Sequence, residues 1–162
     1  IKDPLTSLYT VQYMHHTIQH LIEMHDRNDE FIVGLLIVNI TNLDEIATNF
    51  GIMQKEIILT QAADEIQDTI RPTDFPIRLT NNEFAIFVLG NATNDMDIIA
   101  KRLKKSIEKI KNQAAIGDTS LDVSIGMALH KKEEKLIAFL ERTDEAVEEA
   151  TKNEKSKIFM SS

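Results

Sequence analysis

The chain contains no cysteine, only three prolines and five glycines, and no apolar run of the length that a membrane span needs. The missing cysteines exclude disulfides and thiolate metal sites, which fits a reducing compartment. No segment is rich enough in glycine, proline or serine to divide the chain, and no signal-peptide pattern is present. We therefore expect a single cytoplasmic domain over residues 1–162. Because the sequence starts abruptly at Ile1, we expect this domain to be cut from a longer protein.

Positive charge is also scarce. The formal net charge is -8 at pH 7, and the chain has only five arginines: Arg27, Arg71, Arg78, Arg102 and Arg142. A non-specific nucleic-acid or membrane surface needs a basic field, so we expect this domain to bind neither a nucleic-acid polymer nor a membrane directly. An anionic ligand would have to be bound by a local cluster of arginines.

Apolar periodicity divides the chain into alternating strands and helices. Residues 31–40 (FIVGLLIVNI) form an almost continuous apolar run, which is typical of a strand buried on both faces. The remaining patterns predict helices over 11–25, 53–70, 94–110 and 136–152, the last interrupted near Thr143 and Asp144, and strands over 75–79, 83–89 and 121–129. The order predicts an α+β sandwich with a ferredoxin-like βαββαβ core, in which helices flank a mixed, largely antiparallel sheet.

Five segments in this order resemble the motifs of one family. They are DPLTSLYT, LLIVNITNLDEI, RLTNNEFAIF, VSIGMA and TDEAVEEATK. Together they resemble the GGDEF, or diguanylate cyclase, domain, and the match spans nearly the whole chain. The resemblance implies the fold of that family and a bacterial role in cyclic di-GMP signalling.

The departures from the family pattern lie in the active site. In the family, the first Asp of a DxD segment and the Asp of GGDEF hold divalent metal against the GTP phosphates. These positions are Asn39 and Asn82 here, and Thr41 replaces the second Asp. Mg²⁺ is normally held by carboxylates together with phosphates. Glu83 alone remains, so we expect no catalytic residues and no cyclase activity.

Other family positions have changed as well. Thr80 and Asn81 replace the glycines that let the backbone approach phosphate. Asp44 replaces a lysine that faces phosphate in the family. Ala47 and Glu56 replace the Asn and Asp that read guanine. The resemblance thus implies a degenerate diguanylate cyclase that is not an enzyme.

A second site of the family is retained. Arg71-Pro72-Thr73-Asp74 matches the RxxD motif of the family's product-binding site, and Arg102 falls where the family places a further arginine. Arginine can grip a phosphodiester or a guanine edge with paired donors, and an aspartate can accept from guanine. The resemblance implies a cyclic di-GMP receptor that uses Arg71, Asp74 and Arg102. A dimer of the ligand could bridge two protein chains into a homodimer, with exopolysaccharide or biofilm production as the output.

Three other interpretations remain open. Arg71 and Asp74 could form only an exposed ion pair at a helix exit, which contributes at most about 1 kcal/mol. The domain could be an interaction or dimerisation module that binds no nucleotide. It could also be a pseudoenzyme that senses GTP through the altered active-site cleft.

Histidines in the first predicted helix raise the question of a metal site. His16 and His20 have the i, i+4 spacing that can bind zinc, and His15 and His25 lie in the same segment. No carboxylate or further group clearly converges on them in the sequence. We therefore expect solvated or packing histidines and no metal or cofactor.

Overall fold

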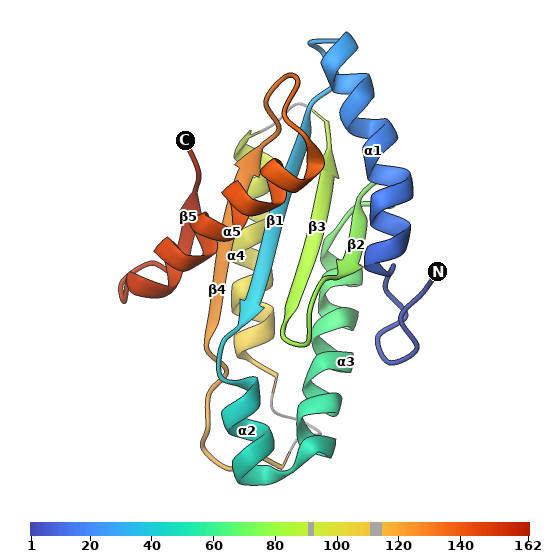
Figure 1. Ribbon diagram of the computed structural model, residues 1–162. Coiled ribbons are helices and arrows are strands. Elements are labelled where there is room, and N and C mark those ends of the chain that lie inside the picture. The colour runs from blue at the N-terminus through green and yellow to red at the C-terminus, as the bar shows by residue number, and fades with distance from the viewer. Residues whose placement is uncertain (91–92, 111–114) are drawn as a thin grey trace.

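A five-stranded sheet organises the molecule (Figure 1). The computed structural model describes residues 1–90, 93–110 and 115–162. The strand order is β2-β3-β1-β4-β5, with the bounds β1 Val33–Ile40, β2 Phe75–Arg78, β3 Glu83–Leu89, β4 Val123–Leu129 and β5 Ile158–Met160. Neighbours among the first four are antiparallel, and β5 pairs parallel to β4. The predicted α+β sandwich with a mixed sheet is confirmed.

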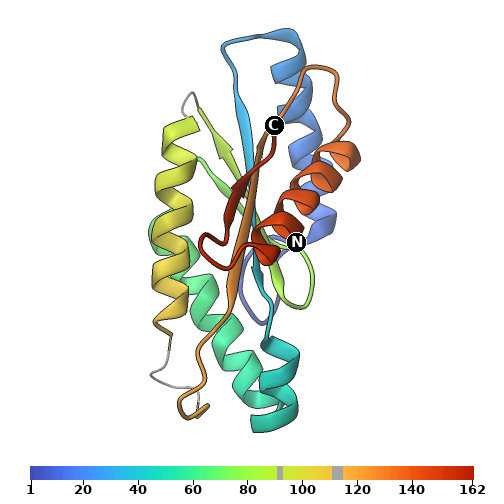
Figure 2. The same ribbon diagram turned by 90° about the vertical axis from the view of Figure 1, so that its left-hand side faces the viewer.

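Helices cover both faces of this sheet (Figures 1 and 2). Their bounds are α1 Val11–Arg27, α2 Leu43–Phe50, α3 Ile52–Thr69, α4 Thr93–Glu108 and α5 Leu136–Lys152. One apolar core lies between the sheet and α3 and α4, and a second lies between the sheet and α1 and α5. In the part of the chain that the structure describes, no helix is long and apolar enough to cross a membrane.

The central strand β1 is buried on both faces because its residues alternate between the two cores. Leu36 and Val38 belong to the core beneath α3 and α4, whereas Leu35 and Ile37 belong to the core beneath α1 and α5. An apolar residue at nearly every position is what a strand covered on both sides requires. This arrangement places Asn39, near the end of β1, on the face that α5 covers.

The structure differs from the sequence prediction at three elements. Helix α5 continues through Thr143 and Asp144, so the predicted interruption is wrong; the Thr143 hydroxyl donates to the Phe139 carbonyl at 2.8 Å, within the helix. Helix α2 was not predicted, and Gly51 separates it from α3 with a φ of 100°. The short edge strand β5 was also not predicted.

Candidate functional site

Two asparagines meet where the resemblance places metal-binding carboxylates. Strand register puts Asn39 opposite Glu83, the first residue of β3. The side-chain amide of Asn82 donates to Oδ1 of Asn39 at 2.9 Å. Thr41, at the next family metal position, donates its hydroxyl to a carboxylate oxygen of Asp122 at 2.7 Å. Asn39 and Asn82 are neutral and bonded to each other, so these two positions bring no negative charge to a cation, whereas Thr41 is bonded to the carboxylate of Asp122.

Arg78 fixes the tip of the β2–β3 hairpin. Its guanidinium donates to the carbonyl oxygens of Thr80 and Asn81, at 2.9 and 3.1 Å, and to Oδ2 of Asp3 at 3.3 Å. The tip is therefore tied both to its own strand and to the N-terminal segment. Sequence reasoning gave Arg78 no role. The signal that could have found it is its position two residues before the tip, together with Asp3 in the entry motif.

Glu83 is the carboxylate retained here from the family's hairpin motif. Burial raises its pKa, the hydrogen bond from the Thr80 hydroxyl (2.9 Å) opposes that shift, and the nearby charge of Asp144 raises the pKa further. A cavity of about 370 Å³ opens beside it, lined by Asn39, Thr41, Asp144, Val147, Glu148, Thr151 and Lys152. The carboxylates of Asp144 and Glu148 face a single lysine there. Such a lining does not favour a triphosphate.

The positions that read guanine in the family lie on α2 and α3. Ala47 is on α2, and the exposed Glu56 helps to line a cavity of about 340 Å³ together with Leu5, Met53, Ile57, Thr60, Gln61 and Asp64. Oε1 of Gln61 is buried without a hydrogen-bond partner among the described residues. Asp44 is exposed and forms an ion pair with Lys55 at 3.0 Å. Of these three positions, only Glu56 lines this cavity.

Arg71 and Asp74 form a tight turn between α3 and β2. One oxygen of Asp74 accepts from the Arg71 backbone N–H (3.0 Å) and the other accepts from the Leu89 backbone N–H (3.3 Å). The Arg71 guanidinium donates to the Leu89 carbonyl at 2.9 Å, and its Nε lies 3.6 Å from Asp74. The Asp74 side chain is fully buried, whereas that of Arg71 is 47% exposed. Because Asp74 is buried, the two residues do not form the fully exposed ion pair of the alternative interpretation.

Arg102 lies on the exposed face of α4. Within the described residues no hydrogen bond or ion pair joins it to Arg71. Met96, six residues earlier in α4, lines a cavity of only about 10 Å³ together with Arg71 and Gly90. Arg102 lies six residues, or about 9 Å, further along α4 than Met96. A nucleotide would have to bind on the surface above Arg71, because this cavity is too small to contain one.

Comparisons with known proteins identify the family of this chain. Residues 1–157 match the family model described as "Diguanylate cyclase, GGDEF domain". The chain is 28% identical over 130 residues to the diguanylate cyclase DosC of Escherichia coli (strain K12), covering 78% of this chain and 28% of that protein. It is also 28% identical over 153 residues to the response regulator PleD of Caulobacter vibrioides, covering 93% of this chain and 34% of PleD. The chain spans about a third of these curated relatives.

Solved structures share the fold. The diguanylate cyclase SiaD of Pseudomonas aeruginosa, determined with its activator SiaC, superimposes with a TM-score of 0.91 at 19% identity, over 99% of this chain and 62% of that one. The GGDEF domain of DgcB from Caulobacter crescentus, in complex with c-di-GMP, gives a TM-score of 0.89 at 17% identity, over 98% and 94%. At these identities the likeness establishes the fold.

Proposed function

Because this chain belongs to the GGDEF, or diguanylate cyclase, family, we propose that it is a catalytically inactive member that acts as a cyclic di-GMP receptor. The ligand binds at Arg71 and Arg102, and Asp74 completes the site. The domain works in the cytoplasm as part of a longer protein, where ligand binding shifts an assembly equilibrium and controls an output such as exopolysaccharide or biofilm production.

The loss of catalysis follows from the polar groups around Asn39. Two-metal or one-metal activation of a 3′-hydroxyl needs carboxylates that balance the cation. Asn39 and Asn82 are neutral and hydrogen-bonded to each other at 2.9 Å. The single remaining carboxylate, Glu83, has a raised pKa because it is buried, which further weakens it as a cation ligand. Asp144 and Glu148 line the adjacent cavity, but they lie on α5 and do not occupy the positions of the two missing carboxylates.

One observation carries the receptor assignment: the Arg71 guanidinium is held in place while nearly half of its side chain stays exposed. The Leu89 carbonyl and Asp74 fix its orientation. A pre-oriented guanidinium can bind a phosphate or the O6/N7 edge of guanine with little entropic cost. Arg102 supplies a second exposed cation nearby on α4, and the c-di-GMP complex of the DgcB domain provides a precedent in the same fold.

Asp74 takes a different part from the one that the resemblance implies. Both of its oxygens accept backbone N–H groups, and its side chain is fully buried. It therefore acts on the ligand through Arg71, whose turn and guanidinium it holds, rather than by accepting from guanine. Asp74→Asn is therefore expected to lower the affinity for cyclic di-GMP because it releases the Arg71 guanidinium from its fixed orientation.

Calorimetric titration of variants tests this site. Arg71→Ala removes the oriented guanidinium and is expected to lower the affinity for cyclic di-GMP at least tenfold, about 1.4 kcal/mol. Arg27→Ala, which removes an exposed arginine from α1, is the matched control and should change little. Arg102→Ala should weaken binding, while Lys105→Ala on the same helix, with the same loss of charge, should not. Equal effects of each variant and its control would contradict the assignment.

A second candidate function is a GTP-sensing pseudoenzyme. It is favoured by the cavity of about 340 Å³ beside Glu56, where Gln61 leaves a buried oxygen without a described partner. The same titrations with GTP distinguish the two candidates. Binding of GTP that Glu56→Ala weakens and Arg71→Ala leaves unchanged would assign the sensing role to this cavity. Turnover of GTP with Mg²⁺ or Mn²⁺ would contradict both candidates.

A further inference from the structure

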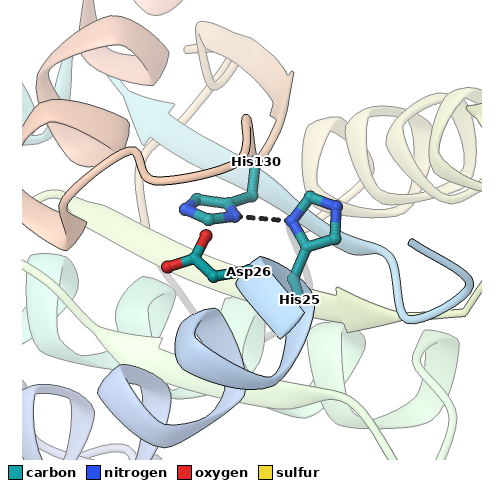
Figure 3. A group of neighbouring side chains, drawn as sticks. All are labelled: His25, Asp26 and His130. Carbon is teal, nitrogen blue, oxygen red and sulfur yellow. Dashed lines mark hydrogen bonds between the residues drawn. The ribbon is translucent and has the colours of Figure 1, made fainter. Parts of the chain in front are cut away.

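Three potential metal ligands converge where α1 ends and β4 ends (Figure 3). His25 and Asp26 belong to the last turn of α1, and His130 directly follows β4. Their nearest ligand atoms all lie within 4.8 Å of one another, and both histidines are buried. The Nδ1 atoms of the two histidines are 2.7 Å apart. The two histidines are 105 positions apart in the chain, so this cluster could not be recognised from sequence spacing.

The hydrogen bonds assign the protons of the two rings. Nε2 of His130 lies 2.7 Å from the carbonyl oxygen of Glu134, which can only accept, so this nitrogen carries the proton. Nδ1 of His130 then offers a lone pair, and His25 Nδ1 donates to it. A histidine that binds metal through one nitrogen almost always donates from the other to a carbonyl or carboxylate. His130 is therefore already oriented as a metal ligand.

Asp26 adds an anionic oxygen to the pair. Its Oδ1 accepts from the backbone N–H of Glu133 at 2.6 Å, which holds the carboxylate in position. Figure 3 shows this carboxylate beside the ring of His130. Two imidazole nitrogens and one carboxylate oxygen form a donor set suited to Zn²⁺ and similar divalent ions. Three protein ligands leave a fourth position for water or another ligand.

We propose that His25, Asp26 and His130 form a binding site for a divalent transition-metal ion, with Zn²⁺ as the best-fitting ion. The ion takes the place of the proton that the two histidines share. A tetrahedral ion with Zn–N bonds of about 2.0–2.1 Å needs the two nitrogens about 3.3 Å apart, so the rings must separate by about 0.6 Å. His25 also moves its proton from Nδ1 to Nε2 when it binds.

One positive charge opposes the ion. Lys132 is close enough for its charge to act on His25, and its ammonium contacts Asp29. Removing this charge should strengthen metal binding, since the ion then meets Asp26 without a nearby cation. Lys132→Ala thus gives the proposal a gain of affinity to test, which a purely structural role of the histidines does not predict.

A bound ion would join distant parts of the chain. His130 donates its backbone N–H to the Val33 carbonyl at the start of β1, and His25 and Asp26 end α1. The ion would tie α1, β1 and the segment that leads into α5. Binding to the folded state alone raises the apparent stability by mass action. An increase in the unfolding temperature on adding Zn²⁺ is the expected secondary effect.

Zn²⁺ titration of the metal-free chain by calorimetry tests the proposal, with Co²⁺ absorption as a probe of coordination. The expected result is one ion per chain, with His130→Gln and Asp26→Asn each lowering the affinity at least about tenfold. Asp26→Asn keeps an oxygen that can accept from Glu133, so this variant should fold even if His130→Gln does not. The control is the double variant His16→Gln, His20→Gln, which removes the exposed helical pair.

The outcomes separate the possibilities. Affinity that falls in Asp26→Asn, rises in Lys132→Ala and persists in the His16, His20 control supports the site. Binding that only the control abolishes would place the ion on the surface of α1 and overturn the proposal. Absence of Zn²⁺ binding to the folded wild-type chain would overturn it as well.

Discussion

The amide pair at Asn39 and Asn82 has a direction that can be tested. Asn82 donates and Asn39 accepts, at 2.9 Å. Asn82→Asp removes the donor and places a carboxylate against an oxygen, which should destabilise the fold by about 0.5–1.5 kcal/mol. Asn39→Asp keeps the donor and gains a charge-assisted acceptor, so its cost should be smaller. Urea unfolding of both variants, with Gln67→Glu as an exposed control, measures the difference. Equal costs would contradict this direction.

Ser7 occupies a conformation that favours glycine. Its φ is 63°, in the left-handed region that side chains with a Cβ rarely adopt. The left-handed conformation costs a residue with a Cβ about 1–2 kcal/mol of folding free energy. Glycine avoids this cost, but part of the gain is offset because glycine loses more conformational entropy on folding. Ser7→Gly should therefore stabilise the protein by about 0.5–1 kcal/mol, read from the urea midpoint. Ser120→Gly, at an exposed loop position outside the left-handed region, should destabilise it instead. Stabilisation by both changes would point to another cause.

Glu83 makes a specific contribution to the dependence of stability on pH. Burial raises its folded pKa above the ordinary value of 4.5, helped by Asp144 and opposed by the Thr80 hydrogen bond. The folded state therefore binds this proton more tightly than the unfolded state does. The free energy of unfolding falls as the pH rises from the unfolded-state pKa of Glu83 through its folded-state pKa. Glu83→Gln should remove that loss. Unfolding free energies measured from about pH 4 to about pH 7 give this contribution, with Glu45→Gln, at an exposed position, as the control. If the unfolding free energy of Glu83→Gln depended on pH as that of the unchanged protein does, the raised pKa would be contradicted.

The sequence predicted where some residues of the site lie, but not their hydrogen-bond partners or their burial. Asn39, Asn82 and Glu83 were placed together through the family resemblance, and the structure brings them together at one end of β1. Their hydrogen-bond partners could not be predicted, since an amide can donate or accept. The burial of Asp74 was also beyond prediction, because it depends on the Leu89 backbone, fifteen residues away in another strand.

Helix α5 packs so closely on β4 that a methyl group between them has no space. A Cβ on Gly126 would lie 2.4 Å from the Val147 nitrogen and 2.8 Å from the Thr143 carbonyl oxygen. Backbone atoms cannot yield locally, so Gly126→Ala should destabilise the protein by about 3 kcal/mol or more. A Cβ on Gly34 in β1 would meet the flexible side chain of Met96 instead, so Gly34→Ala should cost less. Chemical unfolding of both variants checks this order; a reversed order would contradict it.

Among the helices and strands, the long periodic segments and the short strand β2 were predicted, whereas α2 and β5 were missed. The apolar run of β1 and the helical spacing of α3 and α4 each extend over many residues, so packing and pattern agree. Helix α2 and strand β5 have eight and three residues, and tertiary contacts rather than local pattern stabilise them. Thr143 and Asp144 suggested a break in α5, yet the Thr143 hydroxyl bonds within the helix.

For the chain as a whole, the sheet places two functional regions at opposite ends of β1. Asn39 and the hairpin tip lie at its C-terminal end, while Leu89, which bonds Arg71 and Asp74, lies opposite Val33 at its start. A ligand at Arg71 would therefore contact none of the altered catalytic positions.

Titration of the purified chain with cyclic di-GMP by calorimetry, beside cyclic di-AMP, tests the receptor function most directly. Saturable binding of cyclic di-GMP, with little or none of cyclic di-AMP, is the predicted result, and its stoichiometry would show whether a ligand dimer bridges two chains. Absence of heat from cyclic di-GMP at concentrations near 100 μM, which corresponds to a binding free energy weaker than about -5.5 kcal/mol, would contradict it. The remaining candidates would then be a GTP-sensing pseudoenzyme and a module that acts through protein contacts.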